Sequence, residues 1–430
     1  MAASAPTSST FPSTSKLDQD AADELFSKLG ILMFLDAPKK LEFGIDMNTW
    51  EIGPLFKGIK LIPPGIHFIH YSTTADSGHS GMRMGFFHDF REGEILVKKW
   101  NASEEQLYPG SGLLENQVQE IKKGIRYFDP NLGAYQFDPA PNSAHSRWVN
   151  LISHVTHDTL VRDLPSDFQI SSATGSAYDV EEMEAAKKKQ ARIAEAGVTS
   201  RTNEGQPAAT DPDQVAATMT AAAVSRFRCE QQPMDSSNSL NFPLIDLVRS
   251  FPQNASPETI TQYSRDKSWK LRSLLRRHFG NDPNQLLADL QLSFVILLIG
   301  QNFSAFEHWK RIVHLLTSCT EALGDERLQE SLFVPFVSVL KAQLRECPQD
   351  FFINILSENN FISASLQRFV ASIADLDKSL VNWGLVDAID DLRTFMQRRF
   401  SWTLLTMEEA QKVFDLEEGD DAPVVVDIDG

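Results

Sequence analysis

Two histidine pairs stand at spacings that bear on metal binding or acid–base chemistry. His67 and His70 are three residues apart in a segment with β-strand alternation, so we expect them on opposite faces and unable to share a metal. His154 and His157 are three apart in a segment of helical spacing, where they could face the same way. No acidic or cysteine ligand is patterned beside them. The sequence therefore favours solvated histidines and predicts no metal and no cofactor.

Motifs that position a catalytic group are absent from the sequence. The chain has no GxxxxGK[ST] phosphate loop, no GxSxG elbow, no HExxH helix and no dinucleotide glycine fingerprint. Catalytic residues need not be close in sequence, so an enzyme with an unrecognised site in the N-terminal β domain stays an alternative. A ligand-sized pocket with a converging histidine and carboxylate would favour that alternative.

Ser256 directly precedes Pro257, a pattern that a proline-directed kinase modifies. The same serine, followed by Pro257 and Glu258, is also typical of a helix start with a capping side chain. The two hypotheses are compatible, because a phosphate at a helix N-terminus would be stabilised by the free N–H groups there. Ser256 is therefore both a predicted cap and a predicted phosphorylation site.

The C-terminal end combines an acidic run at 417–421 with a valine-rich segment. Three consecutive valines favour extended structure, and the apolar residues of this segment are Val424, Val425, Val426 and Ile428. A lone strand is not stable in water. Two hypotheses stand equal on the residues alone: the segment adds to the sheet edge of a partner, or it pairs with the N-terminal sheet of its own chain.

Charge and composition restrict the partner. The 430 residues include 40 Lys and Arg against 58 Asp and Glu, for a net charge of -18. A duplex nucleic-acid binder needs a basic face, so this balance argues against one. Phe303, Phe306 and Trp309 have helical spacing without interleaved basic residues, which favours core packing over base stacking. The acidity suits a basic protein partner, or simply keeps the chain soluble.

Targeting and redox signals indicate a reducing compartment. Cys229, Cys319 and Cys347 are well separated, which argues against a disulfide framework and a zinc ribbon. Residues 1–16 lack the apolar centre of a signal peptide. The longest apolar stretch, 292–299, is too short for a membrane helix, so we expect no membrane span.

The first part of the chain is predicted to be a disordered tail at 1–20 and a mainly-β domain at 21–170. Short apolar runs are separated by turn residues between 30 and 100, a spacing that favours an antiparallel sandwich or barrel-like sheet. Helical spacing over 146–164 predicts a helix that closes the domain. The predicted strands are Ile31–Leu35, Leu41–Ile45, Ile59–Ile62, Gly65–Tyr71, Met82–Phe87 and Ile95–Trp100.

The remaining chain is predicted to be a flexible linker at 171–238, an all-α domain of about seven helices at 239–405, and an acidic tail with a terminal β-strand at 406–430. Ser, Ala, Thr, Gly and Gln dominate the linker. Its run Lys187–Lys189 is a candidate nuclear signal, but the neighbouring glutamates favour a solvated charged helix. Stacked helical pairs fit the C-terminal pattern, although no clear repeat is found.

Within the helical part, several boundaries are marked by local signals. A helix is expected to start at Ser256-Pro257 and to end at Gly280, and the next is expected to start at Asp282-Pro283. The segment 286–299 is apolar nearly all round. We therefore expect it in the middle of the helical array.

Several of these segments together resemble the signature of the A1 cistron-splicing factor family. The resemblance extends over both predicted domains and the tail. In the N-terminal domain it is carried by Phe43-Gly44-Ile45-Asp46, Trp50–Pro54, Phe56–Phe68, His70-Tyr71-Ser72 and Arg83–Phe87. In the C-terminal part it is carried by Leu290-Gln291, Ala305–Arg311, Asp350-Phe351-Phe352 and Ala422–Val426.

The resemblance implies a non-catalytic assembly factor for the U5 small nuclear ribonucleoprotein in pre-mRNA splicing. Family members bind the largest U5 protein, pre-mRNA-processing splicing factor eight, at its C-terminal RNase-H-like and MPN-like domains. They hold it in a precursor particle and delay binding of the U5 helicase, which replaces them in the nucleus. Their tail adds a strand between the two partner domains, which favours the augmentation hypothesis for Val424–Ile428.

The resemblance also implies a location in the cytoplasm and nucleus, and release triggered by phosphorylation in some members. We expect no direct nucleic-acid contact, no membrane, and a monomer outside the complex. Besides the enzyme, a helical adaptor that reads short peptides is a further alternative.

Overall fold

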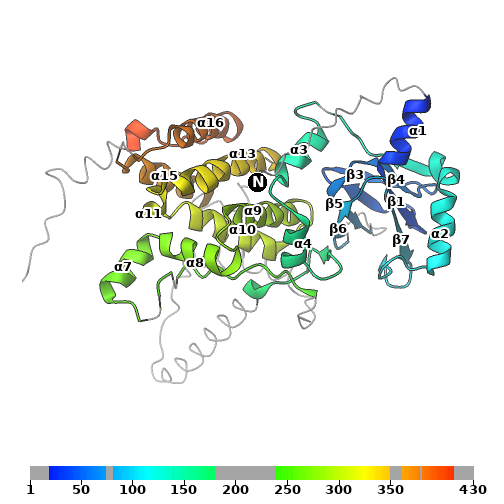
Figure 1. Cartoon of the computed structure of the whole chain (residues 1–430), viewed down its shortest axis with the longest axis horizontal. Helices are drawn as coiled ribbons and strands as arrows, with labels where there is room; N and C mark the ends of the chain where they lie inside the picture. The colour runs from blue at the N-terminus through cyan, green and yellow to red at the C-terminus, as the bar shows by residue number, and fades with distance from the viewer. Residues whose placement is uncertain are drawn as a thin grey trace, which may run out of the picture. The chain divides into compact units, whose positions relative to one another are not determined.

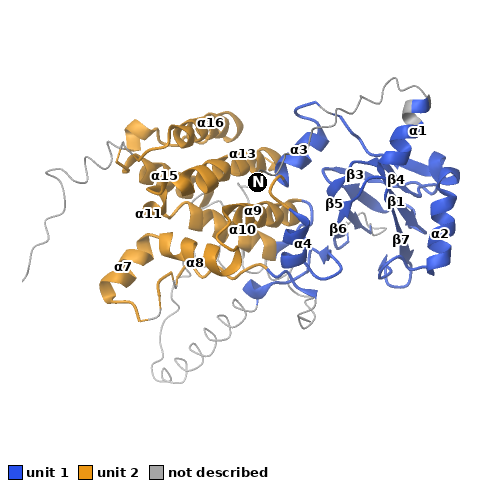
Figure 2. Cartoon of the chain, viewed as in Figure 1, with its two compact units in different colours: residues 1–152, 156–241, 299–303 blue, residues 153–155, 242–298, 304–430 orange. Residues whose placement is uncertain are grey.

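The computed structural model describes residues 19–73, 81–138, 140–179, 238–248, 250–252, 254–348, 361–377 and 380–410. The chain divides into two compact units (Figure 2). Unit 1 comprises 1–152, 156–241 and 299–303, and unit 2 comprises 153–155, 242–298 and 304–430. Unit 1 carries all the strands of the described residues and unit 2 is helical (Figure 1). The predicted fold class, a mainly-β N-terminal domain followed by an all-α domain, is confirmed.

The described residues of unit 1 contain ten strands in two five-stranded sheets. The first sheet has the order β8-β7-β1-β4-β9 and the second the order β10-β6-β5-β2-β3. The strands of the first sheet are β1 (Gly30–Leu35), β4 (Gly58–Ile62), β7 (Ile95–Asn101), β8 (Gln106–Leu107) and β9 (Leu132–Ala134). Those of the second are β2 (Glu42–Ile45), β3 (Asn48–Glu51), β5 (Gly65–Ser72), β6 (Met84–Phe90) and β10 (Gln169–Ser171).

The prediction of antiparallel pairing is correct for the second sheet and wrong for part of the first. Every pair in the second sheet is antiparallel. In the first sheet β1 pairs with β7 and β4 with β9 in parallel. Parallel neighbours need a long connection, and here the strands of the other sheet lie between β1 and β7 along the chain. Local turn signals carry no information on such distant pairing.

Strand β1 is apolar throughout because both of its faces are covered. Leu32 and Phe34 point into the core between the sheets, where the rings of Phe34 and Phe43 lie 5.2 Å apart. Ile31 and Met33 belong to a second core on the other face. That face is covered by α1 (Gln19–Lys28) and α2 (Glu115–Lys123) (Figure 1), and by the 3₁₀ helix η2 (Ile125–Asn131), which contributes Ile125 to the same core. A strand buried on both faces loses the alternation of a half-exposed strand.

The helix predicted at 146–164 is two shorter helices, α3 (Ala144–Leu151) and α4 (His157–Asp163). A new helix begins at His157 because Thr156 caps it: the hydroxyl of Thr156 accepts a hydrogen bond from Thr159 N at 3.3 Å. His154 lies in the connection between the helices. His154 and His157 therefore do not share a helical face, and that expectation is wrong.

Packing in unit 1 continues into the range predicted as a linker. Ser171 belongs to β10, which pairs with β6, and Ser176 and Tyr178 are buried. The chain returns to this region at Leu240, whose N–H donates to Gly175 O at 2.9 Å. The packed part of unit 1 therefore reaches at least Asp179. Strand β10 pairs at the edge of the second sheet, and the turn that follows it is bonded to Leu240. Residues 180–237, and Cys229 with Lys187–Lys189 among them, lie outside the described residues.

Unit 2 is an array of helices with apolar cores. Seven of its described helices have nine or more residues, in agreement with the predicted number, and two are shorter. The longer ones are α7 (Pro257–Arg265), α8 (Ser268–His278), α9 (Pro283–Leu298), α10 (Phe303–Leu316), α13 (Val334–Glu346), α15 (Phe361–Ala374) and α16 (Trp383–Phe400). The short ones are α11 (Thr320–Leu323) and α12 (Glu326–Leu328), and α12 leads into the π-helical turn η4 (Gln329–Phe333).

The helix expected from Ser256 to Gly280 is divided between α7 and α8. Asp266 ends the first part, and its carboxylate accepts from the N–H of Ser268, the first residue of the second part, at 2.8 Å. The predicted end at Gly280 is confirmed, where a φ of +58° suits glycine. Helix α9 starts at Pro283 as expected and is buried along most of its length. Within the described ranges, the helices are too short or too polar to cross a membrane.

Candidate functional site

Asp46 lies in the turn between β2 and β3, at the centre of a buried polar cluster. Its backbone is left-handed, with φ of +55°, a conformation that aspartate adopts more readily than most residues. Its N–H donates to Phe68 O at 2.8 Å, and its Oδ1 accepts from Phe68 N at 3.0 Å. Two contacts to one residue of β5 therefore fix the turn and its carboxylate.

The other carboxylate oxygen of Asp46 accepts two further hydrogen bonds. His67 Nδ1 and the hydroxyl of Tyr135 each lie 2.7 Å from Oδ2. His67 Nε2 lies 2.9 Å from Pro63 O, so both ring nitrogens of His67 face acceptors. The Asp46 carboxylate and the Pro63 carbonyl therefore hold the ring from both sides. The Asp46 carboxylate and the His67 ring are thus held together inside the sandwich, with both side chains buried.

Tyr135 extends the cluster toward the first turn of α3. Burial, followed by the charge of Asp46, raises the pKa of Tyr135 well above its ordinary value, so the hydroxyl stays a donor. Its oxygen lies 3.3 Å from His145 Nδ1. The pKa of His145 is lowered by burial and then by the charge of His67, which keeps that ring neutral. Strand β5 and the residue after β9 are thus tied to the Asp46 carboxylate in the turn after β2, and α3 is linked to it through Tyr135.

His70 contacts the same turn from the opposite face of β5. Arg83 Nη1 donates to His70 Nδ1 at 2.9 Å, and His70 Nε2 lies 3.3 Å from Asp46 O. Burial, and then the charge of Arg83, lowers the pKa of His70 to about 3. Arg83 Nη2 donates to Glu42 Oε1 at 2.6 Å. The two histidines lie on opposite faces as predicted, and within the described ranges no group of three His, Cys, Asp or Glu side chains is arranged to hold a metal.

Gly44 makes the approach of β2 to His70 possible. A Cβ on Gly44 would lie 2.1 Å from His70 Cε1 and 2.7 Å from Asn48 O, both closer than atoms can pack. The glycine in the segment Phe43-Gly44-Ile45-Asp46 is therefore explained by packing. It allows the hairpin and β5 to come close enough for the contacts of Asp46.

A converging histidine and carboxylate, the arrangement that would favour an enzyme, is thus present but enclosed. The side chains of Asp46 and His67 are only 1% and 2% exposed. Every polar atom that they present is used by another protein group. A substrate would find no exposed atom of this cluster to contact. Its hydrogen bonds instead stabilise the turn and join the sheets.

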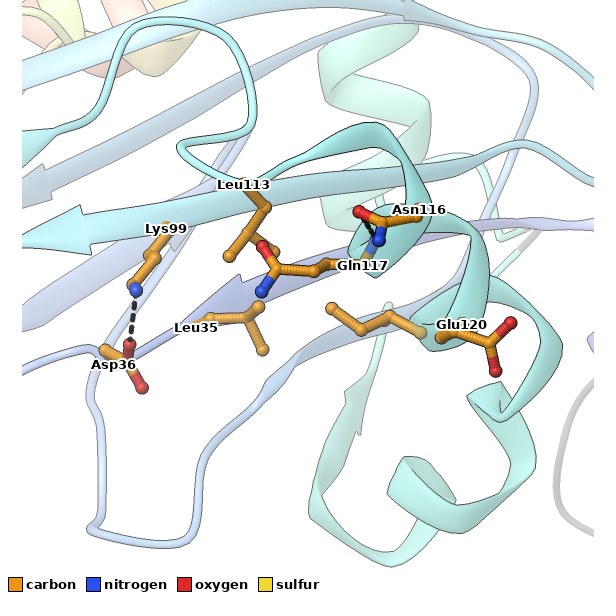
Figure 3. A pocket seen from close by; sticks show the side chains of 8 residues that line it. Leu35, Asp36, Lys99, Leu113, Asn116, Gln117 and Glu120 are labelled. Carbon is orange, nitrogen blue, oxygen red and sulfur yellow. Dashed lines mark hydrogen bonds and ion pairs between the residues drawn. The ribbon is translucent and has the colours of Figure 1, made fainter.

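An open cavity of about 340 Å³ lies elsewhere in unit 1, between the ends of β1 and β7 and the first turns of α2 (Figure 3). Leu35 and Leu113 provide apolar surface, and Gln117 extends between them. An ion pair between Lys99 and Asp36, with Nζ and Oδ2 3.5 Å apart, closes one side. The lining contains no histidine, serine or cysteine.

Unit 2 has polar contacts of its own within an apolar core. Gln343 accepts from Trp309 Nε1 at 2.9 Å and donates to Leu290 O at 2.9 Å. Trp309 and Phe306 are buried, which confirms core packing for them, whereas Phe303 is 39% exposed. His308 stacks on Phe242 with ring centres 4.3 Å apart. The segment Ala305–Arg311 therefore contributes buried side chains to the core of unit 2.

Ser256 is the cap of α7, as predicted. Its hydroxyl accepts from Thr259 N at 3.2 Å, and the residue is exposed. Phosphorylation of Ser256 stays a prediction. The predicted partner-binding residues Val424, Val425, Val426 and Ile428 lie outside the described residues.

The sequence alone does not predict the roles of Asp46 and Tyr135. They are 89 residues apart in the chain and meet only because β9 joins one sheet and the β2–β3 turn belongs to the other. The position of Asp46 between two short extended runs is the only local signal, since aspartate is common in turns. Nothing in the sequence around Tyr135 indicates its partner.

The fold and these clusters define a two-domain protein, with a two-sheet β unit followed by a helical array, in which the main polar clusters are internal. Comparison with known proteins then assigns the family. Residues 28–165 match the model of the AAR2 N-terminal domain, and residues 242–405 match that of the AAR2 C-terminal repeat region. The chain belongs to the AAR2 family, and the resemblance to the splicing-factor family is confirmed.

Similar proteins are matched over nearly their whole length. The protein AAR2 homolog of Mus musculus is 31% identical, with 97% of this chain and 98% of the relative covered. That of Homo sapiens is 30% identical, with 96% and 97% covered. That of Caenorhabditis elegans is 33% identical, with 84% and 90% covered.

Proposed function

We propose that the chain is a non-catalytic assembly factor for the U5 small nuclear ribonucleoprotein in pre-mRNA splicing. It binds the C-terminal RNase-H-like and MPN-like domains of the largest U5 protein, splicing factor eight, and delays helicase binding until nuclear maturation. The observation that supports this most directly is the match to AAR2 relatives across both domains. For this function the chain would be present in both the cytoplasm and the nucleus, and it would be a monomer outside the complex.

The net charge of -18 and the buried state of Phe306 and Trp309 support a protein partner over nucleic acid. The enclosed pair of Asp46 and His67 gives the enzyme alternative no support, because a substrate would have to displace structural hydrogen bonds to reach it. A helical adaptor for short peptides would bind its ligand on unit 2 alone, independently of the tail.

The mechanism assigned to the tail is strand addition by Val424–Ile428 to a sheet of the partner. Main-chain hydrogen bonds would provide affinity and the valine side chains would be buried alternately in the interface. Each buried valine contributes on the order of 1.5–3 kcal/mol before the cost of ordering the segment.

Deletion of residues 422–430 tests the mechanism in a binding titration with the purified C-terminal region of the largest U5 protein. We expect the affinity to fall at least tenfold. Val425→Pro removes a backbone donor and should weaken binding similarly, whereas Val425→Ile keeps the strand and should bind like the original. Equal affinities for the full chain and the deletion would contradict strand addition.

A further inference from the structure

An exposed aromatic side chain marks the start of α16 in unit 2. Trp383 is 73% exposed and Leu380, three residues earlier, is 49% exposed. Large apolar side chains this accessible are unfavourable in water, and tryptophan is strongly enriched at the centres of protein interfaces. We refer to Trp383, Leu380 and the carboxylates of Glu326, Glu330 and Asp387 as the Trp383 patch.

The backbone that presents Trp383 is held by Gln329, a fully buried residue of the π-helical turn η4. Its Nε2 donates to Leu380 O at 2.7 Å, and its Oε1 accepts from Asn382 N at 2.9 Å. The Asn382 side chain in turn caps α16 by accepting from Gly384 N at 2.8 Å. Single π-helical turns occur often at functional sites. The two apolar residues are therefore presented on a fixed backbone, so a partner would not have to order it.

The surroundings of this backbone are acidic. Glu326 and Glu330 are exposed on either side of Gln329 along the chain, and Asp387 is exposed one helical turn after Trp383. Among the described residues these three carboxylates make no ion pair, whereas Glu321 and Asp391 nearby in sequence pair with Arg272 and Lys341. Arg327 is the one basic residue in 321–330.

We propose that the Trp383 patch is a docking surface for a Lys- and Arg-rich segment of a protein partner that carries an apolar side chain. The apolar side chain would pack against Leu380 and Trp383. A basic side chain would be attracted both by the ring face of Trp383 and by the carboxylates. This inference rests on the proposed function, since it assigns to unit 2 a second contact with the U5 partner, separate from the tail.

The test measures binding of the full chain to the C-terminal region of the largest U5 protein by calorimetry at two salt concentrations. Trp383→Ala should weaken binding at least tenfold, as expected for a central aromatic contact. Glu326→Lys with Glu330→Lys should also weaken binding and reduce its salt dependence. Matched controls are Tyr127→Ala, which removes an aromatic side chain that is 89% exposed on unit 1, and Glu104→Lys.

The docking surface is refuted if Trp383→Ala and the double charge reversal both bind within twofold of the original chain. If the original chain itself does not bind the U5 region, the proposed function fails, and a second titration still decides on the patch. Its probe is a 14-residue peptide of alternating lysine and leucine, followed by tryptophan emission. Salt-sensitive binding that Trp383→Ala abolishes supports the surface, and equal responses of the two chains overturn it.

Discussion

The side chain of Asp46 receives three hydrogen bonds from two parts of the β unit, strand β5 and the residue after β9. Phe68 N, His67 Nδ1 and the Tyr135 hydroxyl all donate to its carboxylate, and the residue is 2% exposed. A buried carboxylate is tolerated only when its lone pairs are satisfied and its charge is compensated. The loss of one donor should therefore be measurable as lost stability.

Tyr135→Phe removes the hydroxyl donor and leaves the ring. Hydrogen bonds to charged groups contribute about 1.5–3 kcal/mol, so we expect the free energy of unfolding to fall by about that amount. Urea denaturation followed by circular dichroism measures it. The exposed Tyr127→Phe is the control and should change stability by less than about 0.5 kcal/mol. Equal effects of the two variants would show that the contact with Asp46 contributes little.

The low pKa of His70 predicts a pH dependence of stability. The folded chain keeps His70 neutral down to about pH 3, whereas in the unfolded chain it binds a proton near pH 6.5. Between these values the unfolded state binds more protons, so stability falls as pH falls. We expect the original chain to lose about 1 kcal/mol more than His70→Gln between pH 7.5 and pH 5.5 in urea titrations. Parallel pH profiles would contradict the assignment.

At the scale of elements, the hairpin of β2 and β3 is the part most constrained by its neighbours. Its turn is bonded to β5, its glycine leaves room for His70, and Arg83, the residue before β6, bonds to Glu42 at its start. The helices of unit 2 depend more on local signals. Caps and prolines define the starts of α7 and α9, because those signals act within one helical turn.

Substitutions of Ser256 separate its role as a cap from its predicted role as a phosphorylation site. Ser256→Ala removes the acceptor for Thr259 N and should cost about 1 kcal/mol in thermal or urea unfolding. Ser256→Asp keeps an acceptor at the helix N-terminus and should match the original stability. If Ser256→Asp nevertheless weakens U5 binding while Ser256→Asn does not, negative charge at this cap regulates the complex. If all variants bind the U5 region equally, Ser256 acts only as a helix cap and negative charge there does not regulate binding.

At the scale of the whole molecule, each unit has a core of its own. The β unit has one core between its two sheets and another on the outer face of the first sheet. The core of the helical unit is formed largely by α9, α10 and α13. A family model matches each part separately. Proteins with separate cores often unfold in more than one step.

Two substitutions test whether the units unfold separately. Calorimetry should resolve two transitions, with Tyr135→Phe lowering the midpoint of one and Gln343→Leu lowering the other. Gln343→Leu leaves the buried Trp309 N–H without its acceptor, at a cost of about 1–3 kcal/mol. A single transition that both variants shift equally would indicate one cooperative unit.

Local patterns were sufficient for much of the secondary structure. Six strands lie where apolar runs and turn residues predict them, because alternation and turn chemistry act over a few residues. The sequence patterns missed four strands of two to four residues, β3, β8, β9 and β10. Strand β3, for example, is extended because it pairs along β2. The prediction of one helix over 146–164 was wrong because Thr156 caps a new helix instead of continuing the first one. Hydrophobic periodicity alone does not reveal such a cap.

The sequence by itself determined the class of the two units, the caps at Ser256 and Gly280, and the family, because each rests on periodicity, turn chemistry or matched residues along the chain. Tertiary structure alone decided that β1 and β7 run parallel, that His67 and His70 share Asp46, and that Tyr135 completes the cluster. The physical reason is distance along the chain. Contacts between residues tens of positions apart depend on how the sheets pack, and no local propensity encodes that packing.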